Sequence, residues 1–170
     1  MAFNTAEATD QLLGEGDIPP VHEVNAEGTS PFLLTSDHYG RILPRALRDL
    51  GIPESELVRH IGWDIGIAGV ARPWHIGALY NRDRVLSQLL LKHLRAEGDL
   101  VVGDNEPYAV SDLSDYTIPV HGEARGLVNT GIEIRQDLIA DQSGQQQWAE
   151  RLARIFAAIE MELKPELLAD

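Results

Sequence analysis

The stretch WHIGALYNRDRVLSQLLLKHLRAEGDLVVGDNEPY, residues 74–108, decides the fold. A strand-like apolar run at 74–80 is followed by a helical pattern over about 83–95, whose leucines recur on one side. Residues 100–103 then form a second short apolar run, which is typical of a buried strand. Strand, helix and strand in this order are the repeating unit of a parallel sheet. The sequence therefore predicts an α/β fold.

Upstream of this stretch, residues 31–36 form another short apolar run, and Asp37-His38 follows it directly. We expect a buried strand here, which would deliver the two polar residues to the sheet edge where α/β folds bind ligands. A short helix is expected around 45–50, and Pro53 opens a second helix with apolar residues at helical spacing through Ala68.

Downstream, residues 109–130 carry several Gly, Pro and Asn residues that interrupt regular structure, which favours a long functional loop. A strand is predicted at 131–135. The last helix has an apolar stripe from Trp148 to Leu163, and Ser143 with Gln146 is the pattern of a capping box at its start. The alternation of strands and helices favours a largely parallel sheet.

Composition sets the domain organisation and excludes several classes of protein. The 170 residues are 44% hydrophobic and 24% charged, which is close to the average for globular proteins. We expect an extended arm at 1–30, whose Gly and Pro residues show no periodicity, and a single soluble domain at 31–170. Residues 1–13 carry acids and no apolar run, so we expect no secretory signal and a cytoplasmic protein.

The charge balance limits the possible partners. The chain has 14 Lys and Arg against 27 Asp and Glu, a formal charge of −13. Nucleic acids and anionic membranes are therefore poor partners, because both need clustered cations. The chain has no Cys, so any metal must be held by His and carboxylates.

Two pairs of residues are candidate metal ligands. Asp37-His38 lies at the end of the expected strand, where the acid either ligates a metal or orients the imidazole. His60 and Asp64 lie four residues apart in the expected helix, so both side chains share one face. The alternatives are a hydrogen-bonded Asp-His turn without a metal and a solvated ion pair, and spacing favours these alternatives slightly.

Glu133 is the most informative single residue. In the segment 132–137, charged residues alternate with apolar ones, so Glu133 and Arg135 are expected to point to the same face of a strand. If this face borders a pocket, Glu133 is a candidate general base, and Arg135 is its partner or a structural anchor. If the strand lies at an edge, both side chains are merely solvated.

Other polar residues follow or flank the predicted strands. Candidates for binding a ligand from loops are Asn105, Tyr108 and His121, for which capping of the loop is the alternative. Candidates near the central strand for binding a substrate carboxylate are His75, Arg82 and Arg84, for which a surface salt bridge is the alternative.

In combination, these segments resemble the N-formylglutamate amidohydrolase family. The motifs that carry the resemblance are TSDH at 35–38, RILP at 41–44, RHIGWDIG at 59–66, RPWHIG at 72–77, VGDNEPY at 102–108, HG at 121–122, IEIRQDLI at 132–139 and GQ at 144–145. Each motif is short, but their combination and order from about residue 32 to the last helix are specific.

The resemblance implies a three-layer α/β fold with a mostly parallel or mixed sheet flanked by helices, similar to the zinc carboxypeptidases. It also implies a zinc enzyme that hydrolyses the amide of a small N-formyl or other N-acyl amino acid. In that comparison His38 is one zinc ligand and Asp64, in preference to Asp37, is the carboxylate ligand. Glu133 matches the catalytic glutamate, and Arg135, Asn105, Tyr108, His121 and Arg82 are candidates for binding the substrate.

One departure from the family is large. Relatives carry a long segment, with an Asn-Arg motif and a further His, at the point where Val70 runs directly into Ala71 in this chain. Either residues are missing between these two, or the chain has a true internal deletion. Without that segment the third zinc ligand is not identified, so the alternative to an enzyme is a non-catalytic remnant or binding module of the same fold.

Overall fold

The computed structural model describes residues 12–36, 42–51, 53 and 72–163. The chain divides into two compact units, residues 1–61 and 62–170, and each is described here by itself. Apart from Pro53, the expected helix through Ala68 lies outside the described residues, and so does the junction of Val70 and Ala71. The expected division into an arm at 1–30 and a domain at 31–170 stays a prediction.

In the first unit, the expected strand at 31–36 is wrong. No strand occurs among the described residues of this unit, and Leu33 and Leu34 are 87% and 77% exposed. An apolar run becomes a strand only when a neighbouring strand pairs with it, and periodicity does not report whether one is present. The expected short helix is confirmed as a 3-10 turn, η1, at Arg45–Leu47, whose first N–H donates to Asp17 Oδ1 at 2.8 Å.

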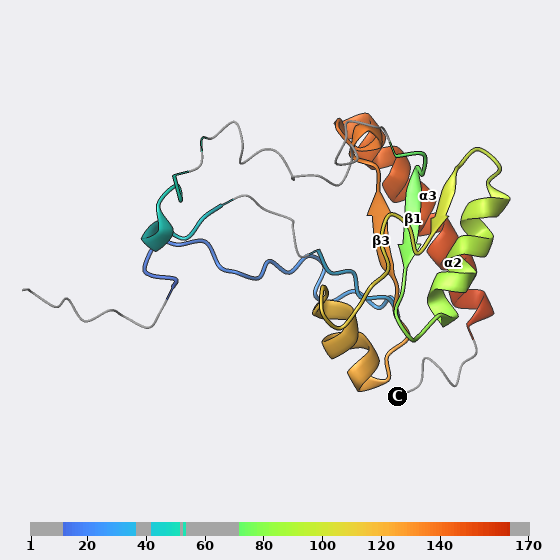
Figure 1. Ribbon diagram of the computed structural model, residues 1–170, viewed down its shortest axis with the longest axis horizontal. Coiled ribbons are helices and arrows are strands. Elements are labelled where there is room, and N and C mark those ends of the chain that lie inside the picture. The colour runs from blue at the N-terminus through green and yellow to red at the C-terminus, as the bar shows by residue number, and fades with distance from the viewer. Residues whose placement is uncertain (1–11, 37–41, 52, 54–71, 164–170) are drawn as a thin grey trace, which may run out of the picture. The chain divides into compact units, whose positions relative to one another are not determined.

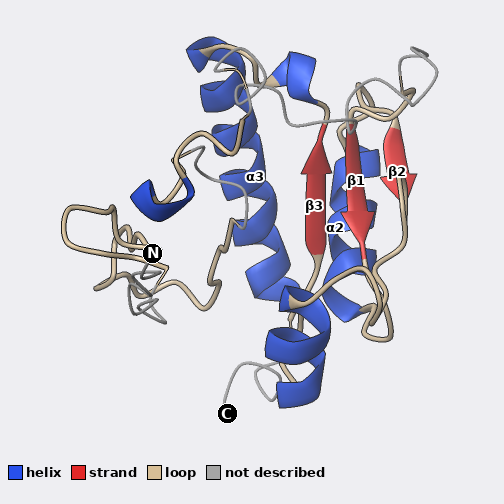
Figure 2. Ribbon diagram, turned by 60° about the vertical axis from the view of Figure 1, so that its left-hand side comes forward, coloured by secondary structure: helices blue, strands red, loops and turns tan. Residues whose placement is uncertain are grey.

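The second unit is built on a mixed sheet with the strand order β2-β1-β3, which confirms the α/β class (Figure 2). The strands are β1 at Ile76–Leu79, β2 at Val102–Asp104 and β3 at Gly131–Ile134. β1 pairs with β2 in parallel and with β3 in antiparallel fashion. The expectation of a largely parallel sheet therefore holds for β1 and β2 and fails for β3.

Two helices lie together to one side of the strands (Figure 1). α2, at Val85–Ala96, connects β1 to β2 and packs on both, as a parallel pair requires. α3, at Gln142–Glu162, packs on α2. The core residues between these elements are 8% exposed or less, and they include Ile76, Ala78, Leu90, Leu91, Leu94, Trp148, Ile155 and Ile159. No helix in the described residues has the length and apolar character needed to cross a membrane.

The start of α3 differs from the expected capping box. Asp141 has extended backbone angles and its carboxylate accepts the N–H of Gly144 at 2.8 Å, so Asp141 is the N-cap. Ser143 and Gln146 lie inside the helix. Asp141 is equally suited to cap a helix, and because it precedes Ser143 in the chain the helix begins two residues earlier than expected.

The region at 109–130, expected to be a loop, contains a helical turn. A π-helical turn, η2, spans Thr117–Gly122 and continues as the 3-10 turn η3 at Glu123–Arg125. The Glu123 side chain is only 7% exposed and accepts the backbone N–H groups of Arg82 and Asp83 at 2.6 and 3.0 Å. This carboxylate therefore ties the loop after β1 to the turn at 123–125.

Three residues lie in one row across the sheet and leave one face of the sheet open to the loop after β2. Gly103 on β2, Gly77 on β1 and Glu133 on β3 are direct neighbours in register, so their side-chain positions point to the same face. A side chain at Gly77 would overlap the carbonyl oxygen of Glu106, and one at Gly103 would lie 2.8 Å from Glu106 Cβ. The two glycines therefore form a flat floor on which the backbone of Glu106 and Pro107 rests beside Glu133.

This floor predicts a strong effect of a single methyl group. We expect Gly77→Ala to lower the free energy of unfolding by about 1–3 kcal/mol or more, because the loop at 106–107 must move off the strand. Gly14→Ala is the control, since a Cβ there makes an ordinary contact of 3.8 Å with Asp17. Urea denaturation of both variants tests this, and equal unfolding midpoints would contradict the close approach.

A second prediction concerns Glu123 and pH. Burial raises the pKa of this carboxyl, but the backbone N–H groups of Asp83 and Arg82 and the Arg82 guanidinium outweigh burial, so the net pKa lies below its usual value. A carboxyl whose pKa is lowered by folding stabilises the folded state at pH values above its unfolded pKa. This stabilisation is lost as the pH falls through the folded pKa.

We expect Glu123→Gln to lower the free energy of unfolding at neutral pH by about 1 kcal/mol, because a neutral amide accepts weaker hydrogen bonds from the backbone N–H groups of Arg82 and Asp83 than the carboxylate does. The difference from the wild type should begin to narrow as the pH falls through the ordinary Glu pKa of about 4.3, and it should disappear only at lower pH, where the folded carboxyl is protonated as well. Denaturation at several pH values measures it, and a difference independent of pH would show that the charge of Glu123 does not matter.

Candidate active site

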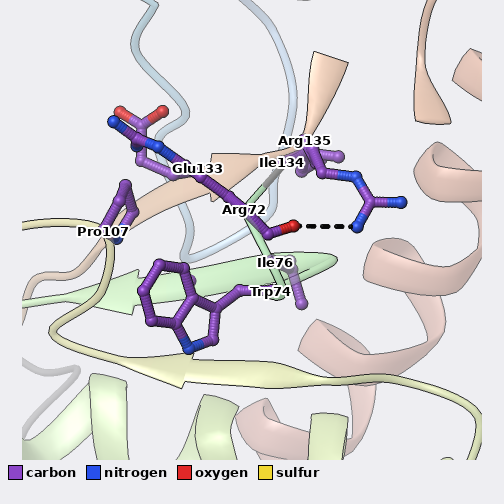
Figure 3. A pocket seen from close by; sticks show the side chains of 8 residues that line it. Arg72, Trp74, Ile76, Pro107, Glu133, Ile134 and Arg135 are labelled. Atoms are coloured by element: carbon purple, nitrogen blue, oxygen red, sulfur yellow. Dashed lines mark hydrogen bonds between the residues drawn. The ribbon is translucent and has the colours of Figure 1, made fainter. Parts of the chain in front are cut away.

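A small pocket opens where the row of Gly77 and Glu133 meets the end of the sheet (Figure 3). Its volume is about 20 Å³, which has room for a water molecule and is too small for an amino acid derivative. The residues that line it come from β1, β3 and the segments before and after the strands, namely Arg72, Trp74, Ile76, Gly77, Pro107, Glu133, Ile134 and Arg135. Of the predicted site residues, Glu133 and Arg135 therefore lie at one pocket.

Glu133 lies on β3 with its carboxylate in a half-buried position on the pocket wall. The hydroxyl of Tyr108 donates to Glu133 Oε1 at 3.1 Å. Tyr108 reaches this position because the chain after β2 crosses the glycine floor toward β3. The structure thus joins two predicted site residues that lie 25 positions apart in sequence.

Tyr108 is a stable donor in this arrangement. Burial raises its pKa well above the ordinary value for tyrosine, and the negative charge of Glu133 raises it further. The nearby charge of Arg72 acts in the opposite direction and is outweighed. The phenol therefore stays protonated at neutral pH and donates to the carboxylate.

Arg135 is an anchor and not a partner of Glu133. Its guanidinium points away from the Glu133 carboxylate (Figure 3). It binds both carboxylate oxygens of Asp137, at 2.6 and 3.1 Å, and Nη1 donates to the backbone oxygen of Arg72 at 3.3 Å. Arg135 directly follows the last residue of β3, and Asp137, two residues further on, holds its guanidinium. A role in binding substrate stays a prediction.

The residues of the pocket wall that the sequence did not single out as site residues include Arg72, Trp74 and Pro107. The Arg72 side chain extends along the pocket toward the Glu133 end, and its Nη1 atom is buried (Figure 3). The motif RPWHIG placed a cation just before a buried strand, but this is the amino end of β1, whereas open α/β sheets bind ligands at the carboxyl ends of their strands. That motif did not show which face Arg72 would occupy.

Asn105 has a structural task in the turn after β2. Its backbone φ is 54°, its N–H donates to the Ala78 oxygen at 3.0 Å, and its side-chain Oδ1 accepts the N–H of Tyr80 at 2.8 Å. Asn tolerates this left-handed conformation better than most residues. These bonds fit the loop-capping alternative, and binding of a substrate by Asn105 stays a prediction.

Arg82 and His121 do not line the pocket beside Glu133. Arg82 is ion-paired with Asp112 and Glu123. His121 is exposed and lies edge-on to the Tyr116 ring, with 5.4 Å between the ring centroids. Their roles in binding substrate stay predictions, and for Arg82 the observed contacts match the salt-bridge alternative.

The predicted metal ligands His38, Asp37 and Asp64 lie outside the described residues. Within residues 12–36, 42–51, 53 and 72–163, no group of three His, Asp or Glu side chains is arranged to hold a metal ion. His75 accepts the N–H of Val101 at its Nδ1 at 2.8 Å and so joins the segment before β1 to the segment before β2.

The comparison with known proteins agrees with the sequence motifs. Residues 71–140 match the family model of N-formylglutamate amidohydrolase. Among solved structures, the chain is similar to a gene product of Agrobacterium tumefaciens at 35% identity and a TM-score of 0.48, a match that covers 56% of this chain and 39% of that chain. The chain thus matches well under half of that protein's length. No curated protein matches.

All eight residues that line the pocket fall within the matched segment. The resemblance read from the sequence is thereby confirmed over residues 71–140, which carry the sequence pattern of the N-formylglutamate amidohydrolase family.

Proposed function

We propose that the chain hydrolyses the amide bond of an N-formyl amino acid, with Glu133 as the general base. The observation that carries the proposal is the Glu133 carboxylate on the wall of a water-sized pocket, within the segment that matches an amidohydrolase family. The family match supports an amidohydrolase-like function. Beyond this, we propose that the reaction depends on a metal and that the substrate carries a formyl group.

Amide hydrolysis needs a proton taken from water and a proton given to the leaving nitrogen. Glu133 can perform both transfers, since a carboxylate accepts the proton from the attacking water and then returns it to the amine. The C–N bond breaks, and the products are formate and the free amino acid. The pocket has room for one water beside this carboxylate.

The positive charge of Arg72 at the pocket wall suits an anionic substrate or the formate product, because a guanidinium binds carboxylates through two parallel hydrogen bonds. In a chain of net charge −13, such a local cation is needed to attract an anion.

The metal part of the proposal rests on the sequence motifs. His38 with Asp64, or Asp37, would hold zinc, for which imidazole and carboxylate are suitable ligands. When bound, zinc supplies Lewis acidity toward a carbonyl oxygen and toward water. The third ligand is not identified among the described residues.

Replacing the base is the first test of this proposal. We expect Glu133→Gln to lower kcat for release of formate from N-formyl-L-glutamate by about 10²–10⁴-fold, since the amide keeps the shape but cannot accept the proton. Glu160→Gln, on the exposed face of α3, is the matched control and should keep the wild-type rate. A Glu133→Gln rate within twofold of the wild type would exclude Glu133 as the base.

Metal content is the second test, and its readout does not depend on activity. We expect the purified wild-type chain to bind about one zinc per chain, and His38→Ala to lose most of it, because each structural or catalytic site depends on its full set of ligands. His22→Ala is the control outside the predicted ligand set. A wild type that folds, binds no zinc and releases no formate would favour the non-catalytic alternative.

A further inference from the structure

Tyr108 and Glu133 come from different elements and meet at a single hydrogen bond of 3.1 Å. We propose that Tyr108 is a positioning residue that orients Glu133 for proton transfer, and does not bind substrate directly. This inference rests on the proposed function of Glu133 as the base. It gives a new role to a residue that the sequence motifs only placed among candidates for substrate binding.

The first argument is geometric. The Tyr108 hydroxyl donates to one oxygen of the Glu133 carboxylate, Oε1. A carboxylate accepts hydrogen bonds at both oxygens. The bond to Oε1 therefore restricts the orientation of the carboxylate and leaves Oε2 available to accept a proton. A Glu side chain otherwise samples several rotamers, and a base that moves by about 1 Å loses much of its rate advantage.

The donor that the fold provides to Glu133 is a phenol and not a guanidinium. A guanidinium bound to both oxygens would hold the carboxylate and also engage the oxygen that must accept a proton. The Arg135 guanidinium is bound to Asp137 and points away from Glu133, so it does not play this part (Figure 3). The phenol of Tyr108 is neutral, and burial together with the charge of Glu133 raises its pKa, so it keeps its proton.

The third argument is that the fold is built to bring Tyr108 to this place. Gly77 and Gly103 both lack a side chain where the backbone of Glu106 approaches, and Glu133 is the next residue in the same row of the sheet. A side chain at either glycine would displace the loop that ends in Tyr108. The two glycines thus allow the loop to place Tyr108 beside the Glu133 carboxylate.

A kinetic comparison of two hydroxyl deletions tests the inference. We expect Tyr108→Phe to lower kcat for formate release about tenfold or more while KM changes less than about twofold, because a misaligned base affects the chemical step and not ground-state binding. Tyr80→Phe is the matched control, since it also removes a hydroxyl that donates to a carboxylate, Asp104 Oδ1 at 2.8 Å, but away from the pocket. It should keep the wild-type kcat.

Two kinetic outcomes would overturn the inference. A raised KM with an unchanged kcat would make Tyr108 a substrate-binding residue. Equal losses of kcat in Tyr108→Phe and Tyr80→Phe would make its effect a general consequence of losing a hydrogen bond.

A titration that needs no activity separates this inference from the proposed function. With tyrosine labelled by 13C at the ring carbon that bears the oxygen, the NMR signal absent from Tyr108→Phe identifies Tyr108. We expect this signal to titrate well above the usual pH range of tyrosine, and to move to lower pH in Glu133→Gln, because the neighbouring negative charge is gone.

An unchanged titration in Glu133→Gln would overturn the pairing itself. If the wild type releases no formate, the proposed function fails and the positioning role fails with it, whereas the NMR titration still shows whether Tyr108 and Glu133 interact.

Discussion

The candidate site depends on one steric constraint, the close approach of the Glu106 backbone to Gly77 in the central strand. Van der Waals overlap forbids any side chain larger than hydrogen there. Gly103 in the neighbouring strand meets the same segment, so the loop after β2 lies flat against the sheet. Because Glu133 follows in the same row, this packing brings Tyr108 within hydrogen-bond distance of its carboxylate.

The other face of the sheet keeps this row in register. Ile76 and Ala78 alternate with Gly77 along β1 and are 1% and 0% exposed. A slip of one residue would move these apolar side chains to the pocket face, so burial against the helices fixes which residues stand beside Glu133. One strand register therefore decides both which side chains fill the apolar core and which residues line the polar pocket.

The sequence predicted the elements that local periodicity specifies and missed features that depend on distant partners. The strand at β1 and the helices α2 and α3 were predicted because their apolar residues recur at regular spacing. The strand expected at 31–36 is absent because strand formation depends on a neighbour that the run itself does not encode. For the site, the alternation at 132–137 singled out Glu133. The glycine floor, the turn of Arg135 toward Asp137 and the role of Arg72 depend on contacts between segments far apart in sequence.

The glycine floor lets the loop after β2 bring Tyr108 to Glu133. A crystal structure of the full chain tests this arrangement most directly, through the distance from Tyr108 Oη to the Glu133 carboxylate. We expect a hydrogen bond of about 2.6–3.2 Å, with the Glu106 carbonyl lying over Gly77. A Tyr108 hydroxyl turned to solvent, more than about 4 Å from both carboxylate oxygens, would contradict the account.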